Sequence, residues 1–240
     1  DAQYIAKLRS EMGLDQPLPQ QLLHYLGQVA HLDLGYSYRN QAPVWDLLSE
    51  RLPATLSLMG SAFVISSLFG VALGALAALS RQRRRWLDGL ISNGALLLYG
   101  TPPFWLAMLL IVLFSVKLDW LPAFGMQTVA ADLSGFAWLG DRLRHLVLPC
   151  LSLSFLFLAL YVHLTRAATL EALQQEHVYT ARAKGLAPSR IVFAHVLRNA
   201  LLPVVTFAGL QLGQLASGAL LIEVVYSWPG IGRLMYDALS

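Results

Sequence analysis

The residues that could bind a metal ion or act as a nucleophile are few and scattered. The chain has six histidines and one cysteine, Cys150, and no histidines form the H-E-x-x-H pair that holds zinc on one helix face. No serine stands in the G-x-S-x-G turn of a hydrolase nucleophile. The G-x-x-x-x-G-K-S/T loop that surrounds nucleotide phosphates is also missing. We therefore expect no catalytic site, metal or cofactor in this chain. If the protein moves a solute uphill, the energy must come from another subunit.

The secondary structure that positions these residues can be predicted from the stretches that lack charged residues. Charged residues make up 13% of the 240 residues, whereas soluble domains have about 25%. Four stretches of 29, 28, 21 and 24 residues contain no Asp, Glu, Lys or Arg: 52–80, 89–116, 145–165 and 199–222. A membrane-spanning helix needs roughly 20 apolar residues, and buried strands stop at about 8. These stretches predict an all-α, polytopic bundle with four transmembrane helices.

The basic residues predict the orientation of this bundle. The loops 81–88 and 166–198 together contain nine basic and three acidic residues, whereas the other segments outside the spans contain eight and eleven. Because basic loops stay in the cytoplasm, both loops are expected inside and both ends of the chain outside. Residues 1–51 are then an external amphipathic segment, with Leu18, Leu22, Leu26 and Val29 on one helical stripe. Residues 52–222 form the membrane domain, and 223–240 a second external segment.

A few neutral polar residues and prolines lie inside the predicted spans. Gly100-Thr101-Pro102-Pro103 should bend or interrupt the second span, because each proline lacks a backbone donor. A bend at this depth could line a path for solute or could be an ordinary packing kink. Polar groups of the fourth span could line the same path or form interhelical hydrogen bonds. The candidate pore-lining residues are Thr101, Pro102, Gln211, Gln214 and Ser217.

The long cytoplasmic loop, 166–199, has its own pattern. Its first half, to Lys184, is rich in helix formers and stops at Gly185, and Pro188 opens a second helix. We expect a helix, a turn at Gly185 with positive φ, and a helix. No span has a charged residue at its centre, which argues against a proton-coupled or ion-coupled carrier.

Residues 179–185 (YTARAKG), followed after nine residues by 195–198 (HVLR), resemble the EAA loop of permeases of binding-protein-dependent ABC importers. Ala181, Gly185 and Leu197 fit the general pattern. Tyr179 stands where the family often has Glu, and Arg198 where it often has Pro, and both departures resemble the di-/oligopeptide and nickel branch. Further resemblance to that branch lies in 13–18 (GLDQPL), 33–37 (DLGYS), 51–56 (RLPATL), 198–203 (RNALLP) and 227–233 (SWPGIGR).

This resemblance implies a subunit of the bacterial inner membrane with six spans, of which four are present here, so that one span precedes and one follows this sequence. It implies a second homologous permease subunit, a periplasmic solute-binding protein, and two ATPase subunits that hold ATP and Mg²⁺. No nucleic acid is implied. The outer side is then the periplasm. The residues expected to contact the ATPase are Tyr179, Thr180, Ala181, Arg182, Ala183, Lys184, Gly185, His195 and Leu197.

The resemblance is compatible with several substrate classes. Di- and oligopeptides are favoured over nickel or another metal chelate, all of which the branch transports. A protein of another class, a membrane scaffold or receptor subunit that transports nothing, would need neither a pore nor an ATPase. Copurification with two ATPase chains and a second permease distinguishes the importer from the scaffold.

Overall fold

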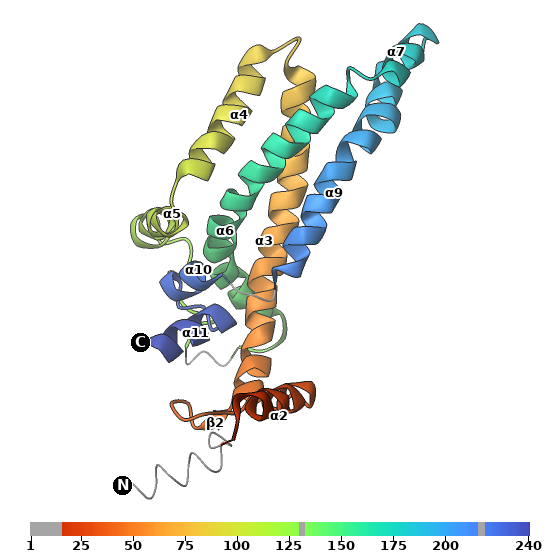
Figure 1. Cartoon of the computed structure of the whole chain (residues 1–240). Coiled ribbons are helices and arrows are strands. Elements are labelled where there is room, and N and C mark those ends of the chain that lie inside the picture. The colour runs from red at the N-terminus through yellow and green to blue at the C-terminus, as the bar shows by residue number, and fades with distance from the viewer. Residues whose placement is uncertain (1–15, 130–132, 216–218) are drawn as a thin grey trace, which may run out of the picture. The chain divides into compact units, whose positions relative to one another are not determined.

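The computed structural model describes residues 16–129, 133–215 and 219–240, which are mostly helical (Figure 1). The chain divides into two compact units, one ending at Glu50 and one beginning at Arg51. The first unit contains α2 (Leu18–Ala30), the strands β1 (Tyr36–Ser37) and β2 (Ala42–Pro43), and the start of α3 (Val44–Ser80). The strands pair antiparallel. Helix α2 begins after Pro17, where the stripe of leucines predicted a helix.

The second unit contains the membrane helices. Three helices of the described residues are long and apolar enough to cross a bilayer: α3, α6 (Gly135–Ala172), and the run from Pro188 to Gly213. That run comprises α8 (Pro188–Arg190), η2 (Ile191–Leu197) and α9 (Arg198–Gly213). A fourth span is present if α4 (Arg85–Gly100) is counted with the bent segment Pro103–Lys117. The predicted all-α polytopic bundle is confirmed.

The bent segment consists of α5 (Pro103–Leu110) and η1 (Ile111–Lys117). Its axis makes an angle of 103° with α4, and the break falls at Thr101 and Pro102. The predicted interruption of the second span is therefore confirmed. Figure 1 shows α4 alongside α6, and α6 alongside α9.

The prediction of one span over 199–222 is wrong at its end. Helix α9 stops at Gly213, and a separate helix, α10 (Leu220–Val225), follows. The charge-free run continues past Gly213 because one face of α10 packs against protein: Ile222 is 2% exposed, whereas Leu221 is 55% exposed. An apolar run indicates that a segment is shielded from water, but it does not distinguish a segment that faces lipid from one that packs against protein. Helix α11 (Ile231–Leu239) follows α10.

The main core lies where α3, α5, α6 and α10 meet. Its buried residues are Ala54, Leu58, Met59, Ala62, Ala107, Leu148, Cys150, Leu153, Ile222, Tyr226 and Trp228. Small residues bring α3 and α6 close together between this core and the loop 166–199. A Cβ atom at Gly74 would lie 2.6 Å from the carbonyl oxygen of Val162 and 2.8 Å from Cβ of Thr165. Any side chain at Gly74 would therefore force the two helices apart.

Candidate functional site

The cytoplasmic loop forms a short helix, α7 (Glu176–Ala183), between the ends of two membrane helices. Helix α6 continues beyond the charge-free run and ends at Ala172. A turn at residues 173–175 then separates α6 from α7, so the helix formers between Arg166 and Lys184 make two helices. The sequence did not indicate this turn, because Leu173-Gln174-Gln175 contains no glycine or proline.

Gly185 ends α7 as predicted, with a φ of +70°. Its N–H donates to the carbonyl of Arg182 at 3.0 Å, and the N–H of Leu186 donates to the carbonyl of Ala181 at 3.3 Å. A Cβ atom at Gly185 would meet nothing within 4 Å, so backbone conformation alone selects glycine here. Any other residue in this conformation costs about 1 kcal/mol or more. Pro188 begins α8 as predicted.

One face of α7 is anchored in protein. Val178 and Ala181 are 0% and 4% exposed and pack in a cluster with Ala172, Ile191, Val196 and Ala200. His177 adds polar contacts to the next helix: its Nε2 atom lies 3.3 Å from the carbonyl oxygen of His195 and 3.2 Å from Nδ2 of Asn199. Helix α7 is thus held against the end of α6 and the start of α9.

The opposite face of α7 is open. Tyr179 is 57% exposed, and Thr180, Arg182, Ala183 and Lys184 are exposed with it. The guanidinium of Arg182 lies 5.9 Å from the Tyr179 ring centroid, within cation–π range. Among the other predicted contact residues, Ala181 is buried, and His195 and Leu197 are half-buried on η2. The structure therefore separates the predicted set into an exposed aromatic and basic face and an anchoring face.

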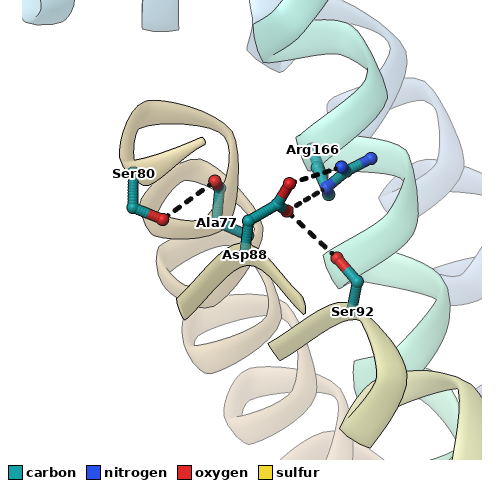
Figure 2. Close-up of polar contacts among 5 residues, drawn as sticks. All are labelled: Ala77, Ser80, Asp88, Ser92 and Arg166. Carbon is teal, nitrogen blue, oxygen red and sulfur yellow. Dashed lines mark hydrogen bonds and ion pairs between the residues drawn. The ribbon is translucent and has the colours of Figure 1, made fainter. Parts of the chain in front are cut away.

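An ion pair that the sequence did not reveal joins α4 to α6 (Figure 2). Arg166 donates from Nε and Nη2 to the two carboxylate oxygens of Asp88, at 2.5 and 2.7 Å. Ser92, one turn further along α4, donates to the same carboxylate at 3.2 Å. Asp88 is only 7% exposed. The sequence placed Asp88 at the end of the loop 81–88. It did not indicate the ion pair, because the partner is 78 residues away and no local pattern connects the two residues.

The described candidate pore-lining residues lie on two segments, the break after α4 and the end of α9. Thr101 donates to the Leu97 carbonyl at 2.7 Å, and Pro102 stands at the bend after α4. Gln211 is 5% exposed, and its Oε1 accepts a hydrogen bond from the Tyr161 hydroxyl at 2.7 Å. Gln214 follows the end of α9, and Ser217 lies outside the described residues. A role in lining the path remains a prediction for all five residues.

A second buried polar group lies at the other end of the unit, on α10. Glu223 is 0% exposed, although its position after the last span predicted an external residue. Its carboxylate accepts hydrogen bonds from the Thr55 hydroxyl at 2.9 Å and from the Arg233 N–H at 3.0 Å. The Thr55 oxygen in turn accepts from the N–H of Ile231 at 2.8 Å. Glu223 and Thr55 thus cap the N-terminus of α11, where unpaired backbone donors favour a negative charge.

Two aromatic residues extend this buried polar group. The Trp228 indole donates to the Ala54 carbonyl at 2.8 Å. The Tyr226 hydroxyl lies 2.8 Å from the Ser152 hydroxyl and 3.2 Å from the Ala107 carbonyl. The segment after α10 is therefore bonded to α3, α5 and α6, and not exposed. In the described part of the chain, no three His, Cys, Asp or Glu residues lie close enough to hold a metal ion.

Comparisons with known proteins agree along the whole chain. The family described as the binding-protein-dependent transport system inner membrane component matches residues 70–240, and the N-terminal family of these membrane components matches residues 1–59. The chain is 41% identical to the di/tripeptide transport system permease protein DppB of Pseudomonas aeruginosa (strain UCBPP-PA14), over all of this chain and 75% of that protein.

Two further relatives come from Escherichia coli (strain K12). The dipeptide transport system permease protein DppB is 41% identical over 98% of this chain and 74% of its own length. The glutathione transport system permease protein GsiC is 41% identical over 100% of this chain and 73% of its own length.

Two solved structures share the fold. The MetNI methionine ABC transporter in inward facing conformations has a TM-score of 0.60 and 18% identity, over 80% of this chain and 79% of that chain. An amino acid ABC transporter with histidines has a TM-score of 0.57 and 17% identity, over 80% and 77%.

Proposed function

Because the chain belongs to the family of inner membrane components of binding-protein-dependent transport systems, we propose that it forms the solute path of an ATP-driven importer for di- and oligopeptides. It is a multi-pass transport subunit of the bacterial inner membrane. The complex we propose contains a second homologous permease subunit, two ATPase subunits that hold ATP and Mg²⁺, and a periplasmic binding protein that delivers the solute.

Peptides are the substrate class that the relatives support. The three named relatives transport di- and tripeptides, dipeptides, and glutathione, which is itself a tripeptide. Each matches nearly the whole chain, including the predicted spans and the cytoplasmic loop. This is the reason to prefer peptides to nickel or a metal chelate.

The proposed coupling rests on the two faces of α7, one buried against protein and one exposed. The open face, with Tyr179, Arg182 and Lys184, is available to an ATPase subunit. The anchored face, with Val178 and Ala181, rests on the ends of α6 and α9. Close-packed interiors transmit displacement because they compress little. An ATPase that moves α7 therefore moves the ends of two membrane helices, and the Asp88–Arg166 ion pair passes the movement from α6 to α4.

Gly185 provides the test of coupling. Gly185→Val places a β-branched residue at a φ of +70°, so the turn after α7 must change. We expect ATPase copurification and peptide uptake to fall while the protein still inserts into the membrane. Gly140→Val is the matched control, because Gly140 is exposed within α6 and has open space around its Cβ position. If Gly185→Val retains full ATPase copurification and full peptide uptake, the proposed coupling role of this loop is wrong.

The substrate class is tested separately by uptake. Cells that lack their own peptide importers and express this protein with the other subunits of the proposed complex should accumulate a labelled dipeptide. Unlabelled tripeptide should compete with the dipeptide for uptake. Accumulation should stop when the ATPase subunit carries an inactive nucleotide site. Uptake of nickel without uptake of dipeptide would contradict the peptide assignment and leave the importer role intact.

A further inference from the structure

A basic cleft lies at the cytoplasmic end of the second unit, beside α7. It has a volume of about 890 Å³ and lies between the turn that joins α3 to α4 and the segment from Tyr179 to Val192. Arg81, Arg83 and Arg85 line it from the turn, and Arg182 lines it from α7. Cationic side chains from two separate elements thus face one space.

The positive charge of the cleft is only partly balanced, because the one described carboxylate in its lining, Asp88, acts on Arg81 but is bonded to Arg166. In the described ranges, no carboxylate lies within ion-pair distance of these four arginines. Four guanidinium groups that face one space and have no ion-pair partner of their own favour an anionic ligand.

The rest of the lining combines uncharged polar side chains, such as Gln82 and Gln174, with an apolar wall. Ala78 and Leu79 of α3, Leu170 and Leu173 near the end of α6, and Val192 contribute the apolar surface. Outside the cleft, Trp86 is 65% exposed at the start of α4, the position at which tryptophan marks the membrane surface. A site that combines arginines with apolar walls at this level fits an amphiphile better than a small soluble anion.

We propose that this cleft binds the headgroup of an anionic phospholipid. The phosphate would lie between the arginines of the α3–α4 turn and Arg182, and the glycerol and first acyl carbons would lie along the apolar wall. Basic pockets between membrane helices on the cytoplasmic side are suited to such headgroups. Because Tyr179 and Arg182 belong to α7, the lipid would also hold this helix to the turn. This inference goes beyond the proposed function, since the binding of lipid does not depend on transport.

The test uses the full-length protein purified from membranes in detergent, with phosphatidylglycerol as the probe and native mass spectrometry as the measurement. Wild-type protein should retain phosphatidylglycerol in preference to phosphatidylcholine. The double variant Arg81→Gln and Arg83→Gln should bind it more weakly, by about fivefold for each arginine removed. Arg84→Gln is the matched control, because Arg84 belongs to the same basic run but does not line the cleft. Equal weakening in Arg84→Gln would overturn the site in favour of diffuse charge attraction.

A second measurement reports on α7 itself. Phosphatidylglycerol should slow amide hydrogen exchange across residues 176–183 in wild-type protein and in Arg84→Gln, but not in the double variant. Inorganic phosphate at matched concentration should have no such effect. If phosphate alone slows exchange equally, the ligand is a soluble anion and the lipid assignment is wrong. If only an added ATPase subunit protects these amides, the cleft is part of a protein contact and the proposal fails.

Discussion

Asp88 and Arg166 form a two-bond ion pair between α4 and α6, close to the point where α6 leads into the cytoplasmic helix α7. Their side chains are 11% and 25% exposed. Because the planar guanidinium matches both carboxylate oxygens, the pair sets the position of α4 along α6 as well as holding the two helices together. This relationship gives the first of four predictions.

Removing Arg166 should leave a buried carboxylate without its counter-charge. We expect Arg166→Met to lower the free energy of unfolding by about 2 to 3 kcal/mol, below the usual cost for a fully buried pair because Arg166 is partly exposed. Thermal unfolding in detergent measures the change. The exchanged variant, Asp88→Arg with Arg166→Asp, should recover part of the loss. An exchanged variant no more stable than Arg166→Met would show that the pairing itself contributes little.

Thr55 should be more important than an ordinary helix threonine. Thr55→Val keeps the shape of the side chain but removes both the donor to Glu223 and the acceptor for the Ile231 N–H. The expected cost is about 1 to 3 kcal/mol of unfolding free energy, because Glu223 stays buried with a lost partner. Thr55→Ser retains the hydroxyl and should lose much less. If Ser and Val destabilise equally, methyl packing rather than hydrogen bonding explains the role of Thr55.

Two glycines of α3 should respond in opposite directions to the same substitution. Gly74→Ala forces a methyl group against the backbone of α6 and should destabilise the protein by about 1 to 3 kcal/mol. Gly60→Ala meets nothing within 4 Å and should stabilise it by about 0.5 to 1 kcal/mol, because alanine favours the helix. Unfolding midpoints of the two variants, measured side by side, check the sign. A neutral Gly74→Ala would mean that α3 and α6 can separate at little cost.

The hydrogen bond between Tyr161 and Gln211 should appear as a coupled pair. Tyr161→Phe and Gln211→Leu should each lower the unfolding free energy by about 1 to 2 kcal/mol, because each leaves a buried partner unpaired. The double variant should cost less than the two single changes added together. If Gln211 instead lines the path, Gln211→Leu will alter peptide uptake at unchanged stability, and the double variant will show no coupling.

The sequence predicted the fold at the points where one local property decides it. The bend after α4 was predicted from adjacent prolines, and the turn at Gly185 from a single glycine. The break at residues 173–175 was not predicted, because its residues all favour helix. There the packing of Val178, on the buried face of α7, against Ile191 and Val196 decides where one helix ends and the next begins.

Charges were the least predictable feature of the candidate sites. The sequence predicted an external position for Glu223 and a loop position for Asp88, because each residue borders an apolar run. Burial of a carboxylate depends on a partner that removes its desolvation cost. Those partners, Thr55 and Arg233 for Glu223 and Arg166 for Asp88, come from other elements of the chain.

By itself the sequence determined the apolar segments and the motif of the loop 166–199, and it predicted their orientation. The lengths of charge-free runs and the placement of basic residues are properties of the chain alone. Only the tertiary structure could show that α10 is packed in protein, that α7 has one anchored and one open face, and that arginines distant in sequence line one cleft. Those features depend on distances between residues far apart along the chain, and composition and periodicity contain no information about such distances.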